Sequence, residues 1–99
     1  MLTAIRSGKI LLPERIDFME LKDTIELMQS TDYKDRFKAE YYQLKIRREN
    51  LIDLLDRWNR GALGFNPDCP FDLLDKQLRN MTAYKEKLEE RAKIEKIEL

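Results

Sequence analysis

Hydrophobic residues recur every three or four positions between Asp32 and Trp58, and most of the intervening residues are charged or polar. The line runs through Phe37, Tyr41, Leu44, Arg48, Leu51, Leu55 and Trp58. This spacing is typical of one face of an α-helix, and no Gly or Pro interrupts it. At about 1.5 Å per residue the helix would be roughly 40 Å long. Its apolar stripe needs another surface to cover it.

The boundaries of this long helix are also marked in the sequence. Ser30, Thr31 and Asp32 can each cap a helix N-terminus, so we expect the helix to begin directly after them. It should end near Arg60, because Gly61 suits the left-handed conformation that follows many helices. The next stretch, GALGFNPDCP, contains two Gly and two Pro and therefore predicts a loop.

A second long helix is predicted after the loop. Pro70 suits its first turn, and Asp72 complements the positive end of the helix dipole. The apolar line comprises Phe71, Leu74, Leu78, Met81, Leu88 and Ala92, with Tyr84 close by, and Ile94, Ile97 and Leu99 extend it to the C-terminus. The short loop forces this helix to run antiparallel to the first, so the two form a helical hairpin.

The N-terminal part of the chain predicts a shorter helix. Phe18, Leu21, Ile25 and Met28 repeat at helical spacing, which indicates a helix from about Pro13 to Gln29. Before it, residues 10–12 fit either a short strand or an ordered arm. We therefore predict an all-α fold, with an arm and short helix in residues 1–30 and a helical hairpin domain in residues 31–99.

The long helices carry more apolar surface than one seam between two helices can bury. The residues off the main line of the first long helix are Tyr33, Tyr42, Ile46, Ile52 and Leu54. The short N-terminal helix can cover only part of this surface. We therefore predict a homo-oligomer.

Composition and charge narrow the classes of function. The 99-residue chain has 19 basic and 19 acidic side chains, and this balance disfavours bulk binding of DNA or RNA. No segment has the apolar run of a membrane span or the pattern of a secretory signal. One Cys and no His fit a cytoplasmic protein without a disulfide or a zinc site.

The sequence contains no recognisable catalytic constellation. Ser7 and Ser30 have no His to activate them, and the Gly61–Gly64 pair lacks the Lys-Ser/Thr of a phosphate loop. Cys69 precedes a helix start, where a thiolate is somewhat favoured, but an unreactive loop thiol is the favoured interpretation. We expect no enzyme activity, no cofactor and no metal ion.

Aromatic and basic residues lie close together near the start of the long helix. Tyr33, Arg36 and Phe37 are followed by Arg47 and Arg48; aromatic faces can stack on bases, and Arg can bind phosphates through two hydrogen bonds. The simpler interpretation, with aromatics in the core and cations in solvent, is favoured on these residues alone. Arg48 falls in the apolar line, so it either extends out to solvent, pairs with a carboxylate or faces a site between associated chains.

Two spaced motifs resemble a known family. The first is D-Y-x-x-R at Asp32, Tyr33 and Arg36, followed by Glu40, Leu44, Arg47 and Leu51. The second is L-L-x-x-Q-x-x-x-M-x-x-Y-x-x-x-L-x-x-R, at Leu73, Leu74, Gln77, Met81, Tyr84, Leu88 and Arg91. The pattern resembles a phage family of small helical-hairpin proteins and is similar to the hairpin domain of sponges that counter the CBASS and Thoeris defence systems. The resemblance covers about residues 32–91.

This resemblance implies that the protein binds a ligand and does not cleave it. Such sponges are oligomers that hold cyclic nucleotide immune signals uncleaved, in pockets between chains, in the cytoplasm of the host cell. The ligand would be a cyclic di- or trinucleotide or a cyclic ADP-ribose-type molecule. The expected ligand-binding residues are Tyr33, Arg36, Phe37, Arg47, Arg48, Gln77, Tyr84 and Arg91.

The loop GALGFNPDCP is longer than in compact sponges, and the segment before Ser30 lies outside the resemblance. The alternatives are a small protein–protein interaction module and a structural component of a phage particle.

Overall fold

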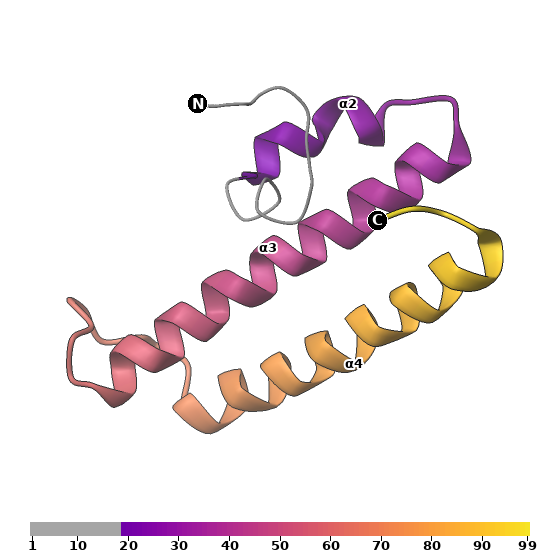
Figure 1. Cartoon of the computed structure of the whole chain (residues 1–99). Helices are drawn as coiled ribbons and strands as arrows, with labels where there is room; N and C mark the ends of the chain where they lie inside the picture. Colours follow the sequence, from indigo (N-terminus) through magenta and orange to yellow (C-terminus); the bar gives the residue numbers. More distant parts are fainter. Residues whose placement is uncertain (1–18) are drawn as a thin grey trace, which may run out of the picture.

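Two long antiparallel helices form the body of the molecule (Figure 1). The computed structural model describes residues 19–99, and within that range the chain contains helices and no strand. The elements are the 3₁₀ helix η1 (Leu21–Thr24) and the α-helices α2 (Ile25–Met28), α3 (Tyr33–Asn59) and α4 (Phe71–Glu95). α4 lies along one side of α3, and η1 with α2 lies along another (Figure 1). This arrangement confirms the all-α fold and the hairpin; the oligomer stays a prediction.

Both ends of α3 are formed by the residues that the sequence indicated. The Asp32 side chain accepts a hydrogen bond from the backbone N–H of Lys34 at 2.9 Å and so caps the helix. At the other end Gly61 has a φ of 68°, the left-handed conformation expected of it. The long helix therefore begins and ends as predicted.

The C-terminal end of α4 differs from the prediction that the helix continues to Leu99. The helix ends at Glu95, and Lys96 adopts a left-handed conformation with φ 59° and ψ 45°. The N–H of Ile97 then donates to the carbonyl of Ala92 at 2.8 Å, and the Ile97 side chain is buried while Ile94 stays exposed. The apolar spacing thus continues past the helix because the chain folds back onto the core.

The prediction of a helix from about Pro13 to Gln29 is wrong at Met19 and Glu20. Glu20 is extended, and within the described part of the chain helical structure begins at Leu21. The first part of the predicted helix, residues 13–18, and the apolar residues 10–12 lie outside the described residues. The N–H of Glu20 donates to the Asp23 carboxylate at 2.8 Å, as part of a capping box that marks a helix start.

A buried threonine holds the short helices on α3. The Thr24 hydroxyl donates to the carbonyl of Leu21 at 2.8 Å and accepts from the Gln43 amide at 2.9 Å. Its side chain is fully buried, so these two bonds satisfy a polar group that would be costly to bury alone.

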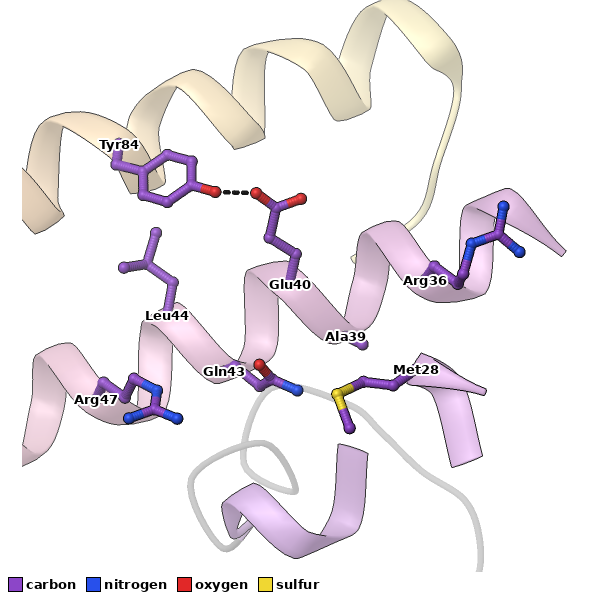
Figure 2. A pocket seen from close by; sticks show the side chains of 8 residues that line it. All are labelled: Met28, Arg36, Ala39, Glu40, Gln43, Leu44, Arg47 and Tyr84. Carbon is purple, nitrogen blue, oxygen red and sulfur yellow. Dashed lines mark hydrogen bonds between the residues drawn. The ribbon is translucent and has the colours of Figure 1, made fainter. Parts of the chain in front are cut away.

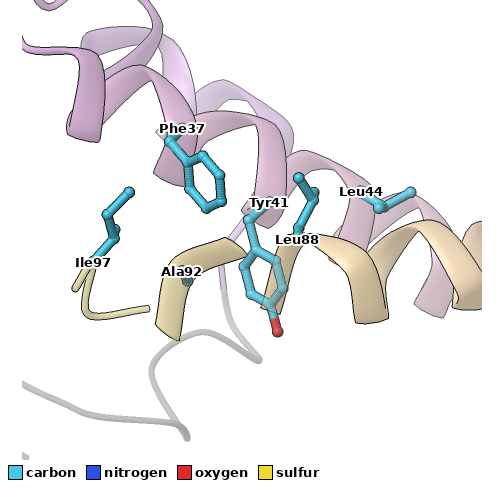
Figure 3. Close-up of a cluster of buried hydrophobic side chains, with 6 residues drawn as sticks. All are labelled: Phe37, Tyr41, Leu44, Leu88, Ala92 and Ile97. Carbon is cyan, nitrogen blue, oxygen red and sulfur yellow. The ribbon is translucent and has the colours of Figure 1, made fainter. Parts of the chain in front are cut away.

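The hydrophobic core lies between α3 and α4, near the end where α3 begins and α4 ends (Figure 3). It consists of Phe37, Tyr41, Leu44, Leu88, Ala92 and Ile97, and all but Ile97 stand on the predicted main apolar lines. Leu88 is only 1% exposed, and burial of such a side chain contributes about 1.5–3 kcal/mol.

One polar network borders this core. The Tyr41 hydroxyl donates to Glu89 at 2.6 Å, and Lys85 also donates to Glu89, at 2.9 Å. Burial, together with the neighbouring carboxylate, raises the pKa of Tyr41. The hydrogen bonds from Lys85 and Tyr41 lower the pKa of Glu89. Both groups are therefore held in the protonation states that they have at neutral pH.

Candidate functional site

A groove of about 480 Å³ runs over α3 between α2 and α4 (Figure 2). It is lined by Met28, Arg36, Ala39, Glu40, Gln43, Leu44, Arg47 and Tyr84. Arg36, Glu40, Gln43 and Arg47 are spaced four, three and four residues apart, which places them on one flank of α3. Met28 of α2 and Tyr84 of α4 stand on opposite sides of this floor (Figure 2).

The two arginines stand at opposite ends of the groove and differ in their contacts (Figure 2). The Arg36 guanidinium donates through Nη1 to the carbonyl of Ser30 at 2.8 Å, which also secures the turn before α3. Arg47 makes no side-chain hydrogen bond or ion pair with any residue of the described chain 19–99. As far as residues 19–99 are concerned, its guanidinium is available to bind an anion.

A carboxylate stands between the two arginines. Glu40 accepts a hydrogen bond from the Tyr84 hydroxyl, which joins α3 to α4 at the groove edge (Figure 2). A carboxylate repels phosphate but accepts hydrogen bonds from amino and imino groups of nucleobases. With Met28 and Leu44 supplying apolar surface, the groove offers cations at its ends and an acceptor in the middle.

A second group of predicted residues forms a separate cluster on the α3–α4 seam. The Arg91 guanidinium lies 4.8 Å from the centre of the Phe37 ring and donates through Nη2 to the Tyr33 hydroxyl at 2.6 Å. Its Nε faces Glu95 at 3.4 Å. Desolvation alone would lower the pKa of Arg91, but Tyr33 and Glu95 outweigh it and the pKa is raised. Two of the five guanidinium N–H donors of Arg91 are thus engaged within the chain, one on Nε and one on Nη2.

The two remaining predicted residues lie away from both groups. The Arg48 Nε donates to the Thr82 hydroxyl at 2.8 Å across the hairpin, a partner that the sequence did not suggest. Gln77 is exposed, and its one side-chain hydrogen bond within residues 19–99 is to the Met81 sulfur, at 4.0 Å. The structure therefore brings Arg36, Arg47 and Tyr84 to one groove, and Tyr33, Phe37 and Arg91 to a neighbouring cluster.

The sequence analysis did not predict five residues of the groove as site residues: Met28, Ala39, Glu40, Gln43 and Leu44. Glu40 and Gln43 lie at helical spacing from Arg36 and Arg47, so the period of the helix could have found them. Met28 comes from another helix, and its position depends on how α2 packs on α3. Within residues 19–99 there is no group of three or more side chains arranged to hold a metal ion. In the same range, no helix combines the length and apolar content that a membrane span requires.

The match to a protein family falls on the same part of the chain. A model of the Sequestin family matches residues 31–94. The chain belongs to the Sequestin family. The match includes all of α3, the loop and nearly all of α4, so it contains every groove residue except Met28. The name Sequestin is consistent with a protein that sequesters a ligand. No curated protein and no solved structure is significantly similar to the chain.

Proposed function

We propose that the protein is a phage anti-defence sponge that binds a cyclic nucleotide immune signal in the host cytoplasm and holds it without cleavage. The observation that carries this proposal is the convergence of Arg36, Arg47 and Tyr84 on one groove of about 480 Å³. Membership of the Sequestin family supports sequestration of a ligand. The proposal that the ligand is a cyclic nucleotide rests on the motif resemblance and on the chemistry of the groove.

Each group in the groove has a role toward such a ligand. Arg47 and Arg36 would bind phosphates, the half-exposed Tyr84 ring would stack on a base, and Glu40 would accept from an exocyclic amino group. One base stack and three charged hydrogen bonds contribute about 5–12 kcal/mol in total. The upper half of this range corresponds to about micromolar to nanomolar affinity, which suffices for a sponge that performs no chemistry.

A second copy of the chain would complete the site. Two side chains that line the groove, Met28 and Tyr84, are about half exposed in the single chain, and so are Ile25 of α2 and Tyr33 of the neighbouring cluster. A partner subunit placed over them would bury this surface and exclude water from the ligand. We expect a homo-oligomer by light scattering after size exclusion; a monodisperse monomer of 11.9 kDa would contradict this part of the proposal.

The direct test is a thermal-shift screen of the purified protein. The panel contains cyclic dinucleotides, cyclic trinucleotides and cyclic ADP-ribose-type molecules. A ligand at a hundred times its dissociation constant should stabilise the fold by about 2.7 kcal/mol. The bound ligand is then recovered after denaturation and analysed by chromatography. Recovery of the intact nucleotide supports a sponge, whereas cleavage products or the absence of any stabilising nucleotide would contradict it.

A protein-binding module is the second candidate, because apolar side chains are exposed where the hairpin turns. Phe65 is 59% exposed and Leu73 is 56% exposed, both in or next to the loop. Such side chains suit the centre of a protein interface. Failure of the nucleotide screen would favour this candidate.

A further inference from the structure

Four lysines surround a second hollow of about 530 Å³, away from the groove. Lys34 and Lys38 come from the start of α3, Lys93 from the last turn of α4, and Lys96 from the left-handed residue after it. Lys34 and Arg36 are two positions apart, which is about 200° around a helix. The hollow therefore lies on roughly the opposite side of α3 from the groove.

These lysines differ from the other lysines of the described chain. Residues 19–99 contain nine lysines, and Lys22, Lys45, Lys85 and Lys87 each pair with a carboxylate. Of the five without such a pair in this range, four line the hollow, and only Lys76 lies elsewhere. Unpaired lysines are thus concentrated at one place on the molecule.

The hollow has a strong excess of positive charge. Four ammonium groups and the carboxylate of Glu98 leave a net charge of three positive units around it. Like charges placed close together repel one another, and a multivalent anion would relieve that repulsion. The buried side chains of Ala92 and Ile97 line the hollow between the lysines.

The reversal after α4 builds this arrangement. The left-handed conformation of Lys96 and the bond from Ile97 N–H to the Ala92 carbonyl turn the chain back toward α3. The turn brings Lys96 beside Lys34 and Lys38, from which it is far in sequence. A helix continued to Leu99 would not form this hollow.

A smaller hollow of about 350 Å³ adjoins the first. It shares Ala92, Lys93 and Ile97 with the first hollow and adds Tyr41, Glu89 and Leu99. A ligand could therefore place anionic groups among the lysines and an apolar part against Tyr41 and Leu99. The two connected hollows suit a small molecule with a compact anionic group.

We propose that Lys34, Lys38, Lys93 and Lys96 form an anion site that takes a diphosphate-bearing small molecule, distinct from the groove. The site is argued from the lysines and the hollow alone, so it does not depend on the proposed function of the groove.

The test is titration of the full-length protein with inorganic pyrophosphate at constant ionic strength. Saturable binding to the parent protein is expected by calorimetry. The double variant Lys38→Gln/Lys93→Gln keeps the length of both side chains without their charge, and it should bind about tenfold more weakly or worse, which equals about 1.4 kcal/mol. The matched control Lys76→Gln removes an unpaired lysine elsewhere on α4 and should leave binding unchanged.

Two further measurements locate the anion. Arg57→Ala, which removes a paired arginine of α3 that lines neither hollow, should bind pyrophosphate as the parent does, and amide NMR shifts of the parent protein should move around Lys34, Lys93 and Lys96. This mapping needs no variant, so it holds even if the double variant does not fold. Absence of saturable binding, equal weakening by Lys76→Gln, or shifts centred on residues 40–47 would each overturn the proposal. A groove that still binds cyclic nucleotide after such a result would leave the proposed function intact.

Discussion

The two ends of the helical hairpin are both built from α3 and α4. They differ in how their charged side chains are paired and in how their apolar side chains are buried. At the loop end, three arginines pair with acidic residues on the same helix, in the pairs Arg57–Asp53, Arg60–Asp56 and Arg79–Asp75, and Lys76 is a single lysine without such a pair in residues 19–99. At the open end, where α3 begins and α4 ends, the four lysines of the second hollow have no carboxylate partner within residues 19–99, and Arg47, at the middle of α3, has none in that range either. Exposed pairs contribute little stability, but they satisfy the charges that form them. Most of the cations without a carboxylate partner in residues 19–99 therefore lie at the open end.

The apolar side chains show the same division. The buried cluster around Leu88 lies at the open end, whereas the loop end has Trp58 and Phe71 in edge-to-face contact at 5.3 Å and leaves Phe65 and Leu73 exposed. A rigid core next to the groove and the lysines keeps the binding groups in place. The loop end can vary without disturbing them.

The largest expected effect tests this difference in packing. Leu88→Ala should lower the free energy of unfolding by about 2–5 kcal/mol, because it leaves a cavity in the core. The matched change Leu73→Ala, on the same helix but exposed, should alter it by about 0.5 kcal/mol or less. Chemical denaturation followed by circular dichroism measures both. Equal losses would show that the loop end is packed as tightly as the open end.

The second prediction concerns the unpaired cation in the groove and rests on the proposed function. Arg47→Ala should weaken binding of the cyclic nucleotide found in the screen about tenfold or more, or about 1.4 kcal/mol. Arg57→Ala removes a paired arginine farther along α3 and should have no effect. Arg36→Ala and Arg91→Ala should also weaken binding, but both also remove bonds within the chain.

Calorimetric titration of each variant, with light scattering to confirm the same oligomer size, checks this prediction. If Arg47→Ala binds as tightly as the parent protein, the groove is not the nucleotide site.

The third prediction concerns the polar network beside the core. Tyr41→Phe should cost about 0.5–1.5 kcal/mol, because Glu89 loses a hydrogen bond. Arg57→Gln breaks the exposed pair with Asp53 on the same helix and should cost less.

The pH dependence follows from the directions of the two pKa shifts. The lowered pKa of Glu89 makes its contribution present above the ordinary value of 4.5 and lost as the pH falls below it. The raised pKa of Tyr41 makes its contribution present below the ordinary value of 10.0 and lost as the pH rises above it. Denaturation curves across pH should show both losses in the parent protein and only the residual loss from Lys85 and Glu89 at acidic pH in Tyr41→Phe. Identical profiles would contradict the network.

The smallest expected effect is at the reversal after α4. Lys96→Gly should raise stability by about 0.5–1 kcal/mol, since glycine adopts the left-handed conformation without strain. Lys76→Gly, inside α4, should lower stability by about 1 kcal/mol. Thermal melting of both variants measures the difference, and a loss of stability in Lys96→Gly would show that another contact of Lys96 matters more than its backbone strain.

Much of the fold could be predicted because local signals coincide with the apolar period. Asp32 caps the N-terminus of α3, and Gly61 adopts the left-handed conformation after its C-terminus. The core residues Phe37, Leu44 and Leu88 stand on apolar lines with regular helical spacing. The end of α4 could not be predicted, because no Gly, Asn or Pro marks Lys96 and the apolar spacing continues to Ile97.

The site was harder to predict, because it joins residues from three helices. Arg36 and Arg47 belong to one helix, so their shared flank follows from the helical period. That Met28 stands opposite Tyr84 depends on how α2 packs, and no local pattern in the sequence encodes it. The engagement of Arg91 by Tyr33 and Phe37 likewise depends on the register of the hairpin.

The hydrogen bond between Thr24 and Gln43 joins the short N-terminal helices, which form one side of the groove, to the long helix α3, which forms its floor. α2 has four residues and α3 has 27, so the wall of the groove that carries Met28 can unfold locally while the hairpin stays intact. Such local opening would change the width of the groove without a change in the contact between α3 and α4. We expect amide hydrogen exchange in residues 21–28 to be faster than at the centre of α3, and to slow when a ligand fills the groove.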